Sequence, residues 1–173
     1  AGDALMSTQV TVLPDPRVRA SEEEMAAWVA TQAEIAGLLD ELLMSLEGAL
    51  EARAQVERMA ARYADAELQT LAGAAVAVID AWESQITELR HQTFEDEDAW
   101  VMKLDGQLRH LLDVVEDGGA PVTEGAVERL VDLKAEWRQR RAALAGITAT
   151  ALAAVNRWAR EHSLPHVPRP GGD

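Results

Sequence analysis

Glu88 and His91 are the residues of this 173-residue sequence whose types and spacing come closest to a reactive site. A Glu-x-x-His spacing puts a carboxylate and an imidazole on one face of a helix. Di-metal carboxylate bundles use two such motifs, plus a Glu from each of two further helices. The nearest second match, Gln107 and His110, has an amide where the metal requires a carboxylate. A metal-binding four-helix-bundle enzyme centred on Glu88 and His91 is therefore the alternative hypothesis, and an exposed pair at a helix end is the interpretation that we prefer.

The remaining patterns give little support for catalysis. The acidic run at residues 95–98 lacks the alternating ligands and central glycine of an EF-hand loop, and acids are favoured at a helix N-terminus. The chain has no cysteine, no Gly-x-Ser-x-Gly elbow and no glycine-rich phosphate loop. We therefore expect no enzyme activity, no catalytic or cofactor-binding residues and no cofactor.

Charge limits the partners of this chain. The net charge of −14 disfavours nucleic acid and anionic membrane surfaces, and no segment has the length and apolar character of a membrane span. Acidic residues outnumber basic ones between residues 21 and 65. Basic residues outnumber acidic ones between 123 and 162, where a basic cluster is formed by Arg138, Arg140 and Arg141. An anionic partner could bind this cluster, but we expect it to pair with the acidic first helix. For the charge split as a whole, solvated faces without specific pairing are an equally good interpretation.

The five tryptophans fall at seam spacing on the helices that the sequence predicts. An aromatic ligand pocket is one interpretation, and core packing is the one we favour, because the chain has only one Phe and one Tyr to supply large side chains. They are Trp28, Trp82, Trp100, Trp137 and Trp158.

The first predicted helix runs from Ser21 to about Arg62, opened by a Ser-Glu-Glu-Glu capping box. Its apolar seam follows three–four spacing, and a second row flanks it at every seventh residue, which together make the broad stripe of a bundle helix. The seam is Trp28, Ile35, Leu39, Leu42, Leu46, Ala49, Val56, Ala60 and Tyr63. The flanking row is Val29, Ala36, Leu43 and Leu50.

Three further helices are predicted at about 65–93, 98–116 and 121–162. Glycines at 118–119 end the third, Pro121 and Thr123 start the fourth, and Leu164-Pro165 ends it. Their expected inward residues are Leu68, Leu71, Ala75, Val78, Ile79, Trp82, Ile86 and Leu89; then Trp100, Val101, Leu104, Leu108, Leu111, Leu112 and Val115; and then Val127, Leu130, Leu133, Trp137, Leu144, Ile147, Ala151, Val155 and Trp158.

The expected fold is all-α, an antiparallel up-down bundle of four helices with two long outer and two shorter inner members. The connections are short, so neighbours should be antiparallel, and part of the bundle should hold fewer than four helices. The bundle should occupy residues 21–164, with a loose tail over 165–173.

Residues 1–20 predict a different kind of structure. Residues 8–13 alternate polar and apolar side chains, as strands do, and Pro14 and Pro16 bracket the turn that follows. A lone terminal strand has no partner in so helical a chain. We therefore interpret residues 1–20 as an extended segment that closes a missing β-domain, so that this chain is the C-terminal piece of something larger.

Several segments, in this order, resemble the helical C-terminal region of large bacterial exported proteins with sortilin-like, BNR-repeat β-propellers. They are VLPDPRV at 12–18, HQTFED at 91–96, KLDGQL at 103–108, PVTEGA at 121–126 and LP at 164–165. The family has Pro-Thr where this chain has Pro121-Val122-Thr123, which should only shift the helix cap. The resemblance implies export to the periplasm or beyond. It assigns no catalytic residues here, and the glycosyl hydrolase label that such proteins often carry belongs to the propeller.

These observations predict a non-catalytic helical accessory module that packs against other domains of its parent chain or against another protein. No nucleic acid partner and no membrane insertion are expected. Pairing of the long helices between two copies, as a homo-oligomer, is a third option.

Overall fold

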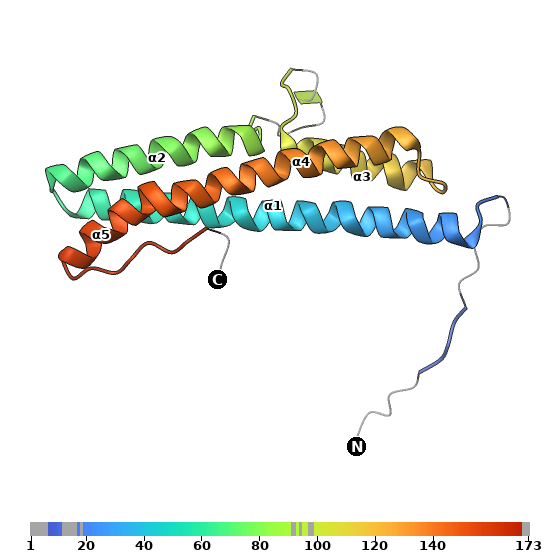
Figure 1. The fold of residues 1–173 in the computed structure, drawn as a ribbon, viewed down its shortest axis with the longest axis horizontal. Coiled ribbons are helices and arrows are strands. Elements are labelled where there is room, and N and C mark those ends of the chain that lie inside the picture. The colour runs from blue at the N-terminus through green and yellow to red at the C-terminus, as the bar shows by residue number, and fades with distance from the viewer. Residues whose placement is uncertain are drawn as a thin grey trace.

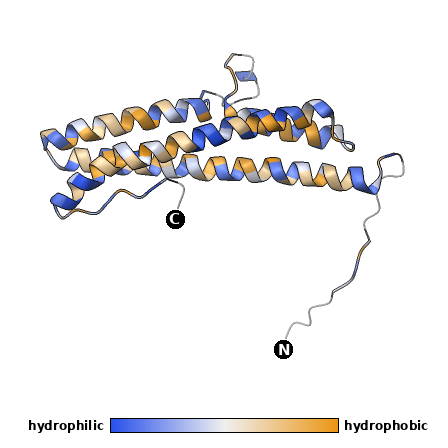
Figure 2. Cartoon of the chain, in the orientation of Figure 1, coloured by the Kyte–Doolittle hydropathy of each residue, from blue (hydrophilic) through white to orange (hydrophobic). Residues whose placement is uncertain are grey.

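The structure is a computed structural model that describes residues 7–11, 17, 19–90, 93, 95–96 and 99–170. Over these residues the chain is an all-α helical bundle, as predicted, and no strand occurs among them (Figure 1). Hydrophobic and hydrophilic residues are interspersed along each helix, as expected for helices that pack on one face (Figure 2). The elements are α1 (Glu22–Arg62), α2 (Ala66–Ile86), α3 (Leu104–Gly118), α4 (Glu124–Ile147), a π-helical turn η2 (Thr148–Leu152) and α5 (Ala153–Glu161).

Helix α1 begins at the predicted capping box and runs the whole length of the bundle. The Ser21 hydroxyl accepts from the Glu24 amide at 3.1 Å, and the Ser21 amide donates to the Glu24 carboxylate at 2.7 Å. At 1.5 Å per residue, its 41 residues span about 60 Å. The predicted seam faces the core: Ile35, Leu39, Leu42, Ala49 and Val56 are buried, and Trp28, Leu46, Ala60 and Tyr63 are half-buried against them.

Helices α2 and α3 lie end to end along α1 and run in the same direction (Figure 1). Both are antiparallel to α1: Arg53 contacts Asp80 of α2 at 2.9 Å, and Trp28, at the other end of α1, donates to the Val115 carbonyl of α3 at 2.7 Å. The Thr87 hydroxyl donates to Asp105 at 2.9 Å and joins the end of α2 to the start of α3. The two inner helices, 21 and 15 residues long, thus cover successive halves of α1 instead of forming a hairpin.

Helix α4 lies parallel to α1. Lys134 pairs with Glu34 and Arg141 with Glu41, so residues a hundred positions apart lie side by side along the two helices. Helix α4 also contacts both inner helices. For example, the Trp82 indole donates to the Arg140 carbonyl at 2.8 Å. A cross-section therefore holds three helices at either end of the bundle.

The fourth predicted helix is continuous, but it contains a π-helical turn. Thr148 and Thr150 donate their hydroxyls to the carbonyls of Leu144 and Gly146 at 3.0 and 2.8 Å. Such back-bonding competes with the α-helical hydrogen bonds and widens the turn. Helix α5 resumes after it with Val155 and Trp158 buried, as the seam predicted.

Two predicted helix boundaries were wrong. Helix α2 stops at Ile86 instead of about Thr93, and α3 starts at Leu104 instead of about Asp98. Leu89 and Val101, expected to face inward, are therefore 67% and 79% exposed. The acidic run does not cap α3, because its N-cap residue is Lys103, which makes no side-chain cap bond. Residues 97–98 of that run lie outside the described residues.

The periodicity also predicted wrongly that three valines face the core. Val29, Val78 and Val127 are 56%, 41% and 48% exposed, because three-helix packing covers a narrower arc of each helix than the predicted stripe.

The segments before and after the helices differ in how they contact the bundle. Within the predicted loose tail, Val167 is 1% exposed; its amide donates to the Asn156 side chain at 2.6 Å and its carbonyl accepts from it at 2.9 Å. Residues 7–11 are exposed and pair with no strand, and residues 12–16 of the predicted strand and turn lie outside the described residues. In the described part of the chain, no helix is both long enough and apolar enough to cross a bilayer.

Candidate functional site

The structure places Glu88 outside the helix on which the Glu88–His91 hypothesis was based. Glu88 follows the end of α2 at Ile86. His91 lies outside the described residues, and the metal hypothesis itself stays untested. Among the described residues, no group of three or more His, Asp or Glu side chains converges as a metal site would require.

Glu88 is instead engaged by Arg90. The guanidinium donates to both carboxylate oxygens, at 2.6 and 2.5 Å, and these hydrogen bonds lower the pKa of Glu88 to about 2. The Arg90 Cζ atom lies 3.6 Å from the centroid of the Trp100 ring, a cation–π distance. This contact joins a residue that follows α2 to one that precedes α3, and Trp100 is 38% exposed there instead of being in the core.

The other tryptophans behave as core residues. Trp82, Trp137 and Trp158 are buried, and Trp28 is half-buried. Trp158 stacks on His162, with ring centroids 4.0 Å apart, and lies 6.2 Å from Tyr63. These four tryptophans therefore pack in the interior of the bundle, as we expected.

Part of the basic cluster pairs with the acidic first helix, as one of the two interpretations predicted. Arg141 pairs with Glu41, whereas Arg140 donates to Gln85 and contacts Glu136 on its own helix at 3.2 Å. These pairs connect α4 with α1 and α2. Each contributes little to stability, because the side chains are partly exposed to water.

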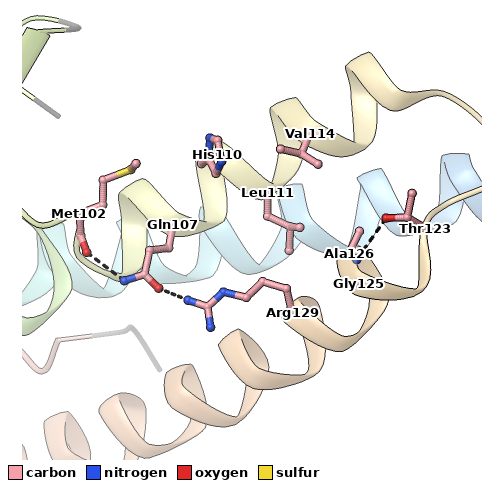
Figure 3. A pocket seen from close by; sticks show the side chains of 9 residues that line it. All are labelled: Met102, Gln107, His110, Leu111, Val114, Thr123, Gly125, Ala126 and Arg129. Atoms are coloured by element: carbon pink, nitrogen blue, oxygen red, sulfur yellow. Dashed lines mark hydrogen bonds between the residues drawn. The ribbon is translucent and has the colours of Figure 1, made fainter. Parts of the chain in front are cut away.

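A cleft of about 440 Å³ lies between α3 and the start of α4, and we call it the α3–α4 cleft (Figure 3). Most of its wall is apolar, and four polar side chains lie among the apolar ones. The lining residues are Met102, Gln107, His110, Leu111, Val114, Thr123, Gly125, Ala126 and Arg129.

Hydrogen bonds run along one wall of this cleft. The Gln107 side-chain amide donates to the Met102 carbonyl at 2.9 Å, and its oxygen accepts from the Arg129 guanidinium (Figure 3). Gln107 and His110 were singled out from the sequence as an incomplete metal motif, and the structure places both on this cleft. The sequence could not predict the cleft itself, because it forms between residues on two different helices.

A second hollow, of about 460 Å³, lies on α1 itself. Leu43, Leu46 and Leu50 form its apolar floor, with Glu47 and Glu51 beside them. We call these five residues the α1 stripe. The three leucines are half-buried, so the bundle leaves part of this apolar face uncovered.

The stripe lies in the middle of α1, between the parts that contact α2 and α3. Contacts of α1 place Arg53 against Asp80 of α2, and Trp28 against Val115 of α3. The middle of α1 therefore lies beside the junction of the two short helices. No protein-family model, no curated protein and no solved structure matches this chain.

Proposed function

We propose that this chain is a non-catalytic helical interaction module, the C-terminal piece of a larger exported bacterial protein, and that the α1 stripe packs against another domain of that protein. The observation that carries the proposal is the half-covered row of leucines in the middle of a long, rigid helix. Apolar area left in contact with water favours association by about 25 cal/mol for each Å² that a partner covers.

The charges around the stripe define the surface that would fit it. Glu47 and Glu51 are exposed beside the leucines, and the whole chain carries a net charge of −14. A complementary partner presents apolar side chains flanked by Lys or Arg, because opposite charges at the rim direct association. The resemblance of residues 12–18 and of the later segments to propeller-protein C-terminal regions supports a partner within the same polypeptide.

The first test is the mass of the native protein. An antibody against this chain, used on cell and exported fractions of the source bacterium, should detect an exported band several times heavier than 18.8 kDa. A band at 18.8 kDa would contradict the multidomain proposal.

The second test locates the contact within the native protein. A photo-cross-linking amino acid at Leu50 should link this chain to a basic segment of an upstream domain. The same amino acid at Val131, which is 58% exposed on α4, is the matched control and should give no such product. Equal cross-linking from both positions, or none from Leu50, would show that the stripe is not the contact. Sedimentation of the isolated chain separates this from self-association, which would double its mass.

A further inference from the structure

The α3–α4 cleft has the construction of a small-molecule site. At about 440 Å³ it lies at the lower end of the range that such sites occupy. Leu111 points between α3 and α4, and Met102, Val114 and Ala126 contribute further apolar surface (Figure 3). Val114 remains 45% exposed, so a ligand with an apolar body would cover a side chain that the bundle leaves in water.

The charge in this cleft has the opposite sign to that of the protein. Arg129 lines it, and none of its lining residues is acidic, although the chain carries a net charge of −14. The guanidinium of Arg129 is held by the neutral side chain of Gln107, and the carboxylate of Asp132 reaches it only at 4.0 Å. Its charge therefore stays available to an anion.

The guanidinium is also held in position before any ligand arrives. The Met102 carbonyl fixes the Gln107 amide, and that amide in turn fixes Arg129. A pre-positioned guanidinium binds an anion with less loss of side-chain entropy than a free one. Gly125 lies in the first turn of α4, where the helix dipole also favours negative charge.

We propose that the α3–α4 cleft binds a small amphipathic monocarboxylate, with the carboxylate on Arg129 and the apolar body on Met102, Leu111 and Val114. A monoanion is favoured over a phosphate dianion because the cleft offers one guanidinium inside a strongly acidic protein. This site is separate from the α1 stripe, so the proposal does not depend on the proposed interaction function.

The direct test is a titration of the intact chain, followed by ¹H–¹⁵N and methyl NMR. The probe is octanoate, at concentrations where it stays monomeric, and octan-1-ol and octylamine are the matched compounds without the anion. Octanoate should shift the signals of Leu111, Val114 and Ala126 saturably, and the two other compounds should bind at least about tenfold more weakly, since each lacks the charge-assisted hydrogen bonds. Equal binding of all three compounds, or shifts centred on Leu43 and Leu50, would overturn the proposal.

Variants connect the binding to the named groups. Arg129→Gln should weaken octanoate about tenfold or more, whereas Arg138→Gln, the same change at an exposed site on α4 outside the cleft, should change affinity less than about twofold. Gly125→Leu should also abolish binding, because a Cβ there meets no atom within 4 Å and the larger side chain would fill the opening. Unchanged affinity in Arg129→Gln and in Gly125→Leu, with the fold confirmed by circular dichroism, would exclude the cleft.

Discussion

Arg90 shows how a residue pattern that suggests chemistry can instead serve structure. Its guanidinium lies against the Trp100 ring and donates to both oxygens of Glu88. Planarity lets one arginine side chain make both kinds of contact at once. The carboxylate of the candidate Glu-x-x-His pair is therefore committed to an arginine two residues away.

The first prediction concerns the acid titration of Glu88. Its pKa of about 2 lies below the ordinary 4.5, so the Glu88–Arg90 contact stabilises the fold at neutral pH and loses this effect as pH falls from about 4.5 through about 2. The ¹³C carboxyl shift of Glu88, followed from pH 6 down to about 3, should stay that of a carboxylate. Arg90→Gln should bring its midpoint back towards 4.5, and a midpoint near 4.5 in the unaltered chain would contradict the contact.

The second prediction tests the assignment of the core. Leu42→Asp or Leu144→Asp should cost more than about 3 kcal/mol and unfold the chain, because each would bury an unpaired carboxylate. Leu42 is fully buried and Leu144 is 4% exposed. Met44→Asp is the matched control, since Met44 is 70% exposed, and it should change stability by less than about 0.5 kcal/mol. Circular dichroism and urea unfolding measure all three, and wild-type helicity and midpoint in either core variant would refute the seam.

At the scale of the helices, the starts that carry a local cap were predicted correctly, whereas the start of α3 and the end of α2 were not. Ser21, Asp65 and Thr123 each accept a hydrogen bond from a backbone amide of their own helix, which is a local event that the sequence displays directly. The end of α2 depends on Thr87 and its bond to Asp105, eighteen residues later. No glycine or proline marks that end, so the apolar period appeared to continue to Leu89.

The candidate sites also combine features that the sequence shows with features that only the tertiary fold shows. The flanking row that contains Leu43 and Leu50 was visible in the sequence as a seven-residue repeat, but not the fact that it remains half-covered. Its exposure results from the in-line stacking of α2 and α3, which is a property of the tertiary fold. The α3–α4 cleft likewise brings Met102 and Gln107, at the start of α3, together with Arg129 of α4.

The third prediction concerns the C-terminal segment after α5. Asn156→Ala removes both hydrogen bonds to Val167, and Val167→Ala removes buried apolar surface. Each should lower the free energy of unfolding by about 1–2 kcal/mol and expose the segment to proteases. Arg169→Ala, at an exposed position in the same segment, is the control and should leave the urea midpoint unchanged. If Asn156→Ala also left it unchanged, the segment would not be anchored in solution.

For the whole molecule, unbalanced charge is the main electrostatic feature. The chain has thirty acidic and sixteen basic residues, and repulsion among the excess negative charges opposes the compact state. Ion pairs such as Glu34–Lys134 counter this locally, but both side chains are about half-exposed, and such pairs contribute little.

The fourth prediction follows from this imbalance. Raising NaCl from about 0.01 M to about 0.15 M at pH 7 shortens the range of the repulsion and should raise the Tm by a few degrees. The double variant Glu47→Gln, Glu51→Gln reduces the net charge from −14 to −12 and should show a smaller rise. A fall in Tm with salt would mean that the ion pairs outweigh the repulsion.

The in-line arrangement of α2 and α3 also has an evolutionary consequence. Thr87 and Asp105 hold the two ends of the α2–α3 connection together, while α1 and α4 carry the bundle past the junction. The length of the connection can therefore change without moving either short helix, and the entropy of closing a loop grows only slowly with its length. This junction is where a lineage can insert a new loop, or a whole domain, while keeping the bundle intact.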